Sequence, residues 1–155
     1  KSLKNKRKIM AQLNPYLTFK GNCEEAFDFY KAAFGKEFTF MGRFKDMPPT
    51  PGCEPIGEEE GNMVMHVSLP ISSETNLFGS DAPKDYREKS VEGNNISISI
   101  NAESKEEADK LFNGLSAGGM VTMPMDNTFW GAYFGMFTDK FGINWMVNFD
   151  TQPMP

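Results

Sequence analysis

The chain has 155 residues, of which 39% are hydrophobic and 24% charged, as is usual for one globular domain with a sizeable core. The net charge of −5 hides a basic start, because five of the 16 basic residues precede Met10 while the chain holds 21 acidic residues. An acidic body argues against a nucleic-acid partner. No apolar run approaches the roughly 20 residues of a membrane span, so a membrane partner is not expected either.

The basic segment 1–9 is interpreted as an N-terminal extension. No apolar stretch follows it, so it does not have the pattern of a signal peptide, and Met10 is a plausible natural start. A surface-binding tail is the alternative. Cys23 and Cys53 show no C-x-x-C spacing, which favours a cytoplasmic protein with reduced thiols.

The first half of the chain predicts one helix among four strands. Asn22, followed by acidic residues, is typical of a helix start, and Gly35 of a helix end. Between them, apolar residues recur at helical spacing: Ala26, Phe29, Tyr30, Ala33 and Phe34. Alternation predicts strands over residues 13–20, 36–44, 61–69 and 75–79.

Residues 46–60 are predicted to form a loop, because four prolines and two glycines rule out a regular element. Two interpretations remain open at this point. The loop is either an inert surface excursion or a lid over a pocket, since long loops are often functional.

The second half repeats the pattern after a polar linker at residues 82–93. A strand is expected over 95–101, and Ser104 opens an S-x-x-E capping box before a second amphipathic helix. A strand at 119–123 and an aromatic hairpin, 132–138 with 143–149, complete this half. The hairpin either closes a hydrophobic core or lines a cavity.

The two helix starts superpose, since Glu24-Glu25-Ala26 matches Glu106-Glu107-Ala108. The fold class is therefore α+β, with two tandem βαβββ units, 10–81 and 94–150, forming curved mixed sheets around a cleft. We treat the two units as one functional domain. Clefts between such units are where ligands usually bind.

Three stretches carry a family resemblance: YLTFKGNCEEAFDFYKAAFG, HVSL…LFGSD and FWGAYFGMFTDKFGINWMV. They resemble the vicinal oxygen chelate superfamily of glyoxalase I, extradiol dioxygenases and bleomycin-resistance proteins, and within it the PhnB-like proteins. These are often labelled 3-demethylubiquinone-9 3-methyltransferase domains. The turn from residue 20 to residue 23, KGNC, is not a Gly-rich cofactor loop, so methyl transfer is disfavoured.

The resemblance also indicates where metal ligands would stand in the superfamily's enzymes. The equivalent positions here hold Asn14, Asn76, Asn95 and Met146. Amides and a thioether are poor ligands for Zn²⁺, Ni²⁺ or Fe²⁺, so neither a metal nor another cofactor is expected.

His66 is the only histidine, and two roles are open for it. It is a pocket-facing polar contact or catalytic base, or else a hydrogen-bonded residue of the sheet. Arg43 is a candidate for gripping an anion. Asp81 and Asp139 are expected to bond their own turns, and Cys23 to be a structural helix-start residue.

The favoured function is binding of a small, partly aromatic or apolar molecule without a metal. The predicted ligand-binding residues are Tyr16, Arg43, His66, Phe78, Trp130, Tyr133, Met136 and Trp145. The alternative is a glyoxalase-like lyase or isomerase, or a dioxygenase-type enzyme, using His66 and a divalent metal. A pure assembly module is a third hypothesis, and the resemblance implies a homodimer.

Overall fold

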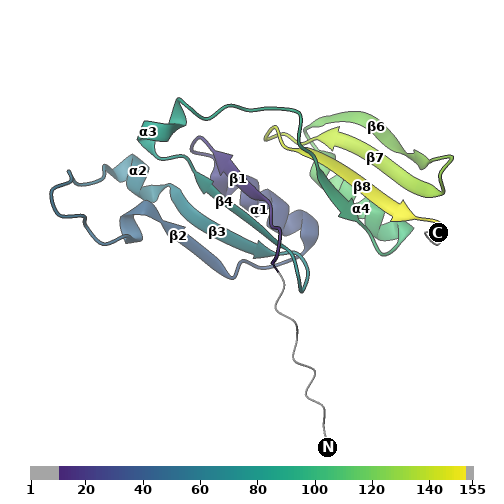
Figure 1. Ribbon diagram of the computed structural model, residues 1–155, viewed down its shortest axis with the longest axis horizontal. Helices are drawn as coiled ribbons and strands as arrows, with labels where there is room; N and C mark the ends of the chain where they lie inside the picture. The colour runs from purple at the N-terminus through teal and green to yellow at the C-terminus, as the bar shows by residue number, and fades with distance from the viewer. Residues whose placement is uncertain (1–10, 153–155) are drawn as a thin grey trace, which may run out of the picture.

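The computed structural model describes residues 11–152, so the predicted basic extension lies outside the described residues. Both halves contain four strands and one long helix (Figure 1). The first half consists of β1 (Tyr16–Phe19), α1 (Cys23–Phe34), β2 (Phe40–Arg43), η1 (Phe44–Asp46), α2 (Glu58–Asn62), β3 (Val64–Pro70) and β4 (Asn76–Asp81). Then come α3 (Lys84–Arg87), β5 (Ile98–Asn101), α4 (Lys105–Ser116), β6 (Met120–Asn127), β7 (Ala132–Thr138) and β8 (Asn144–Asp150).

The two sheets have the same topology. The strand orders are β1-β4-β3-β2 and β5-β8-β7-β6. In each sheet the first strand pairs in parallel with the last, and the other pairs are antiparallel. This confirms the duplicated βαβββ fold predicted from the sequence, although the boundaries assigned to the two units stay a prediction.

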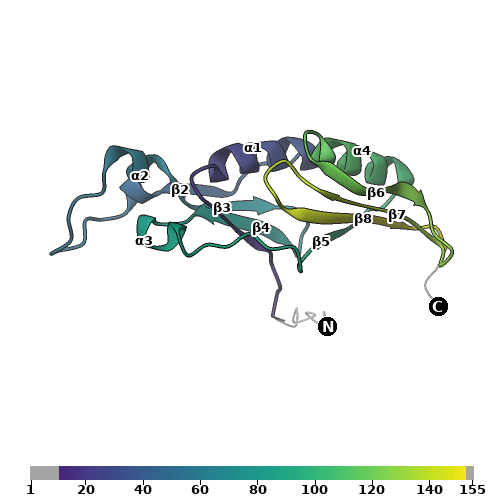
Figure 2. The same ribbon diagram turned by 90° about the horizontal axis from the view of Figure 1, so that it is seen from above.

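Both long helices lie on the same side of the sheet layer. Figure 2 shows α1 and α4 along one side, with the opposite faces of the two sheets left uncovered. Strand alternation accounts for this, because Val67 and Leu69 on β3 are fully buried while Ser68 between them is partly exposed. We call the uncovered side the open face.

The helices pack closely on the sheets. The Phe27 ring of α1 lies so near Gly79 of β4 that an added Cβ would come within 2.4 Å of it. The two helices also meet each other, and a Cβ built on Gly114 would lie 3.6 Å from Ala33. Small residues at these points let the helices and the sheets share one core.

The two long helices begin in different ways. Ser104 caps α4 as predicted, its hydroxyl accepting a hydrogen bond from the Glu107 amide at 3.0 Å. Asn22 makes no side-chain cap. Instead, Asp81 at the end of β4 accepts from the amides of Gly21 and Cys23, at 2.8 and 3.0 Å, and from Val64 at 2.9 Å. Asp81 therefore joins α1, β3 and β4 rather than bonding its own turn.

Several element bounds differ from the sequence predictions. The predicted loop ends earlier than expected, because α2 begins at Glu58. Strand β6 continues past residue 123 to Asn127, with register irregularities that sequence alternation does not reveal. The predicted linker contains the short helix α3.

The loop after η1 leaves the sheet edge and projects beyond β2 and α2 in both views (Figures 1 and 2). It encloses a hollow of about 610 Å³ with η1 and α2, lined by Phe44, Lys45 and Ile56 among others. The loop thus lies away from the open face of its own chain.

The two units are joined through a buried carboxylate. Asp139, in the turn between β7 and β8, is 3% exposed. It accepts hydrogen bonds from the Tyr30 hydroxyl of α1 at 2.6 Å and from the Trp145 indole at 2.8 Å. The amides of Phe141 and Ile143 donate to its other oxygen. Burial, with the adjacent carboxylate, raises the pKa of Tyr30, so its hydroxyl stays a donor.

Candidate functional site

The open face of the first sheet carries a cluster of four rings, which we call the ring floor: Tyr16, Phe40, His66 and Phe78. Each comes from a different strand, and His66 lies among the other three. Its ring centroid is 5.6 Å from that of Tyr16, 6.0 Å from Phe40 and 5.4 Å from Phe78. Tyr16 and Phe40 are each 50% exposed.

The rings of the floor are shallowly tilted, unlike those of the core. Neighbouring planes in the floor meet at 29° to 44°. The aromatic pairs packed between sheets and helices meet at 51° to 89°. Edge-on pairs fill space within a core, whereas shallowly tilted rings present their π faces together.

Gly42 allows the Phe40 ring to lie close against the sheet. A Cβ at this position would come within 2.8 Å of the Phe40 ring, which therefore folds over its own strand. The register pairs Gly42 with His66 on β3, so Phe40 leans toward the imidazole. Phe40 was not among the predicted ligand-binding residues, although the alternation in EFTFMGRF places it on the same face as Gly42.

His66 is fixed by one hydrogen bond within the floor. The Tyr16 hydroxyl lies 3.2 Å from its Nδ1. Among residues 11–152 no hydrogen bond is formed by Nε2, and this atom is not buried. The open-face strand positions around the four rings carry neutral side chains, namely Thr18, Ser68, Asn76 and Ser80.

A cleft adjoins the floor where the two units meet. It encloses about 330 Å³ between β1 and the second unit, within the size range of small-molecule sites. Tyr16 and Thr18 form one wall, and Ile98 and Phe141 are among the residues opposite. The cleft predicted from the duplication thus begins at the edge of the ring floor.

The structure gathers three of the predicted ligand-binding residues, Tyr16, His66 and Phe78, in the ring floor. Met136 lies on the second sheet beside a separate hollow of about 780 Å³. Trp130 stands in the connection between β6 and β7, 60% exposed, with its ring edge-on to Phe129. Neither residue belongs to the ring floor.

Two further predicted residues face the helices. Trp145 is 1% exposed, and its ring packs on Tyr30 and Phe34. The Tyr133 hydroxyl donates to Asp109 of α4, a bond that raises the Tyr133 pKa. For these two residues the structure supports the core interpretation of the hairpin rather than a place in the ring floor.

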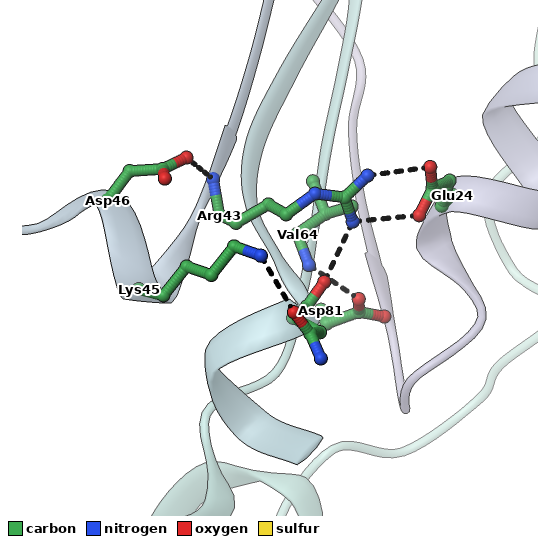
Figure 3. A network of polar contacts seen from close by, with 7 residues as sticks. Glu24, Arg43, Lys45, Asp46, Val64 and Asp81 are labelled. Atoms are coloured by element: carbon green, nitrogen blue, oxygen red, sulfur yellow. Dashed lines mark hydrogen bonds and ion pairs between the residues drawn. The ribbon is translucent and has the colours of Figure 1, made fainter. Parts of the chain in front are cut away.

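Arg43 is engaged in an ion pair (Figure 3). Its guanidinium donates to both carboxylate oxygens of Glu24, each at 2.8 Å, and also to the Asn62 carbonyl at 2.8 Å. The pair raises the pKa of Arg43 and lowers that of Glu24, mainly through the hydrogen bonds between them. An arginine held in this way anchors α1 to the end of β2, and its predicted role in gripping an anionic ligand stays a prediction.

Replacing Glu24 by Gln is expected to lower the free energy of unfolding by at most about 1 kcal/mol at neutral pH, because the pair is partly exposed. The folded-state pKa of Glu24 is lowered, so the pair stabilises the fold above the ordinary carboxyl pKa and loses this effect as pH falls through the folded value. Urea unfolding of Glu24→Gln and of the matched Glu25→Gln, in the same helical turn, measures the difference. A difference that grows in acid would contradict the assignment.

Cys23 has a structural environment. Its side chain is fully buried, and burial together with Asp81 raises the pKa of the thiol. The thiolate is the reactive form, so this cysteine is unsuited to nucleophilic chemistry. It remains a helix-start residue, as predicted.

The positions predicted to be equivalent to the superfamily's metal ligands carry side chains that are poor ligands for a divalent metal. Asn14 uses its side-chain oxygen to accept the Asn76 amide at 2.8 Å. Asn95 is exposed in the segment before β5, and Met146 is a thioether on β8. Within residues 11–152, no three His, Cys, Asp or Glu side chains converge as a ligand set.

The duplicated βαβββ fold places the chain in a class of proteins built from two such units, and comparison of its sequence with family models agrees with this. The model of the glyoxalase/bleomycin resistance protein/dioxygenase superfamily matches residues 12–147, and the chain belongs to this superfamily. None of the helices described over residues 11–152 is long and apolar enough to cross a membrane.

Individual relatives cover nearly the whole chain. Protein YjdN of Escherichia coli strain K12 is 30% identical over 141 residues, 88% of this chain and 93% of that protein. The crystal structure of PA1353 from Pseudomonas aeruginosa is 41% identical with a TM-score of 0.77, covering 92% of this chain and all of that one. A PhnB protein from Bacillus cereus, described as a 3-demethylubiquinone-9 3-methyltransferase, shares the fold at 23% identity and a TM-score of 0.66, covering 90% and 99%.

Proposed function

We propose that the protein binds a small planar aromatic molecule on the ring floor, without a metal. The observation that carries this proposal is the arrangement of four rings whose neighbouring planes meet at 29° to 44° on an otherwise uncovered face. Aromatic faces stack on planar ligands, and each stacked pair contributes about 0.5–1.5 kcal/mol. The cleft beside Tyr16 gives the ligand a second wall.

The binding test uses prodan, an uncharged naphthalene fluorophore whose emission shifts to the blue in apolar surroundings. We expect prodan to bind the full chain, and Phe78→Ala to weaken binding roughly tenfold through loss of a floor ring. Phe129→Ala is the matched control, because Phe129 is 98% exposed and lies outside the floor. Equal losses in the two variants, or no binding to the unaltered chain, would refute the proposal.

A second copy of the chain is proposed to lie over the open faces, with the ligand held between it and the ring floor. The half-exposed rings of the floor support this, as do large apolar residues exposed around the second sheet: Met120, Val121, Met123, Phe129 and Trp130. Native mass spectrometry of protein purified without chelator measures the assembly and its adducts. We expect a metal-free dimer, whereas a monomer would refute the pairing and stoichiometric metal would favour the oxygen-chelate enzymes of the superfamily.

Catalysis by His66 stays a prediction. An imidazole with an accessible nitrogen is suited to general base chemistry, and it is the feature that keeps the lyase or isomerase alternative open. Turnover of a bound ligand that disappears in His66→Phe would support the enzyme, and binding without turnover would support the binding protein.

A further inference from the structure

We propose that Tyr16 fixes the tautomer of His66, and that the site thereby selects uncharged planar aromatic molecules with one hydrogen-bond-accepting oxygen at the ring edge. This inference rests on the proposed function and names the ligand class for the same site. Tyr16 acts as a positioning residue in addition to being a floor ring.

The Tyr16 hydroxyl and the His66 Nδ1 are 3.2 Å apart, so one donates to the other. A neutral imidazole has one nitrogen that donates and one that accepts. The phenol is a stronger acid than a neutral imidazole N–H, so the favoured direction is from the Tyr16 oxygen to Nδ1. The single ring proton then lies on Nε2, which becomes a donor.

Nε2 is available for a ligand. No hydrogen bond satisfies it among residues 11–152, and the atom is not buried. A molecule stacked on the floor would leave this N–H without water unless the molecule itself supplies an acceptor. The matching group is an oxygen in the plane of the ligand, such as a carbonyl attached to the ring.

The surroundings of the floor argue for an uncharged ligand. The open-face strand positions around the rings carry hydroxyls and one amide, on Thr18, Ser68, Ser80 and Asn76. Arg43 is occupied by Glu24, and Asp81 bonds to backbone amides beneath the sheet. The charged residues Lys20 and Glu92 line the adjoining cleft rather than the ring floor. A charged ligand stacked on the floor itself would lose its hydration without gaining a counter-ion from these strand positions.

The first test compares three naphthalenes as competitors of prodan on the full chain: acetylnaphthalene, ethylnaphthalene and naphthoate. Acetylnaphthalene has the acceptor, ethylnaphthalene is its near-isostere without one, and naphthoate is charged. We expect acetylnaphthalene to bind roughly three- to tenfold more tightly than ethylnaphthalene, and naphthoate to bind most weakly. His66→Phe should remove the preference, and Tyr16→Phe should reduce it while ethylnaphthalene binds as before.

The second test reads the tautomer directly. His66 is the only histidine of the chain, so ¹⁵N-histidine labelling gives the signals of one ring. We expect the proton on Nε2 in the unaltered protein and a mixture of tautomers in Tyr16→Phe. A proton on Nδ1, or an unchanged tautomer in Tyr16→Phe, would overturn the role of Tyr16.

The binding site and its ligand selectivity can be refuted separately. If none of the three naphthalenes binds, the proposed function fails and the ligand class fails with it. If all three bind equally, or if naphthoate binds best, only the selectivity inference is overturned and the ring floor stands as a binding site.

Discussion

Replacing Asp139 by alanine is expected to lower the free energy of unfolding by about 4 kcal/mol. Four donors lose their acceptor at once: two backbone amides, the Tyr30 phenol and the Trp145 indole. All lie in or beside the core that joins the two units, where unsatisfied donors are costly. Urea unfolding followed by circular dichroism measures the change.

Two further variants test whether the loss of stability comes from the loss of the buried acceptor. Asp139→Asn keeps the shape but replaces one acceptor oxygen with an NH₂ group, so an intermediate loss is expected. Asp85→Ala removes an exposed carboxylate of α3 and should stay within about 0.5 kcal/mol. A loss below about 1 kcal/mol in Asp139→Ala would show that water replaces the carboxylate and that the contact between the two units is open to solvent.

Replacing Trp145 by alanine is likewise expected to cost about 4 kcal/mol, because the side chain is 1% exposed and packs from β8 onto α1. The second tryptophan is the matched control. Trp130 is 60% exposed, so Trp130→Ala should change stability by less than about 1 kcal/mol. Thermal and urea unfolding of the two variants measure the difference directly.

Prodan binding to the same protein separates the core role of Trp145 from a ligand-wall role. Trp145→Phe keeps most of the packing and should leave prodan affinity unchanged, since the side chain faces the helices. If Trp145→Phe folds normally but no longer binds prodan, the hairpin lines the ligand site after all. Trp145 also donates to Asp139, so Asp139→Ala and Trp145→Ala should be non-additive when combined.

Local patterns were sufficient to predict the duplicated fold. The matching helix starts and the alternating strands gave the βαβββ order, and Ser104 caps α4 as its motif indicates. Asn22 did not follow its motif because Asp81, 59 positions later in the chain, supplies the cap instead. Nothing near Asn22 in the sequence signals a side chain from so distant a strand.

The side of the sheet on which each hairpin residue lies was harder to predict. Strand alternation separates Tyr133 and Phe137 from Phe134 and Met136, but both sets are apolar, so composition does not show which set faces the helices. In the structure Gly135 lies close to the Phe112 ring of α4, which fixes the choice. For the ring floor, Tyr16, His66 and Phe78 were among the predicted ligand-binding residues, whereas Phe40 was not, because aromatic residues occur on both faces of the strands.

The hydrogen bond from Tyr30 to Asp139 joins residues 109 positions apart. During synthesis the first unit emerges before this acceptor does, and an isolated first unit would leave the Tyr30 phenol without its partner. The first unit alone is therefore expected to be less stable than the same unit within the full chain.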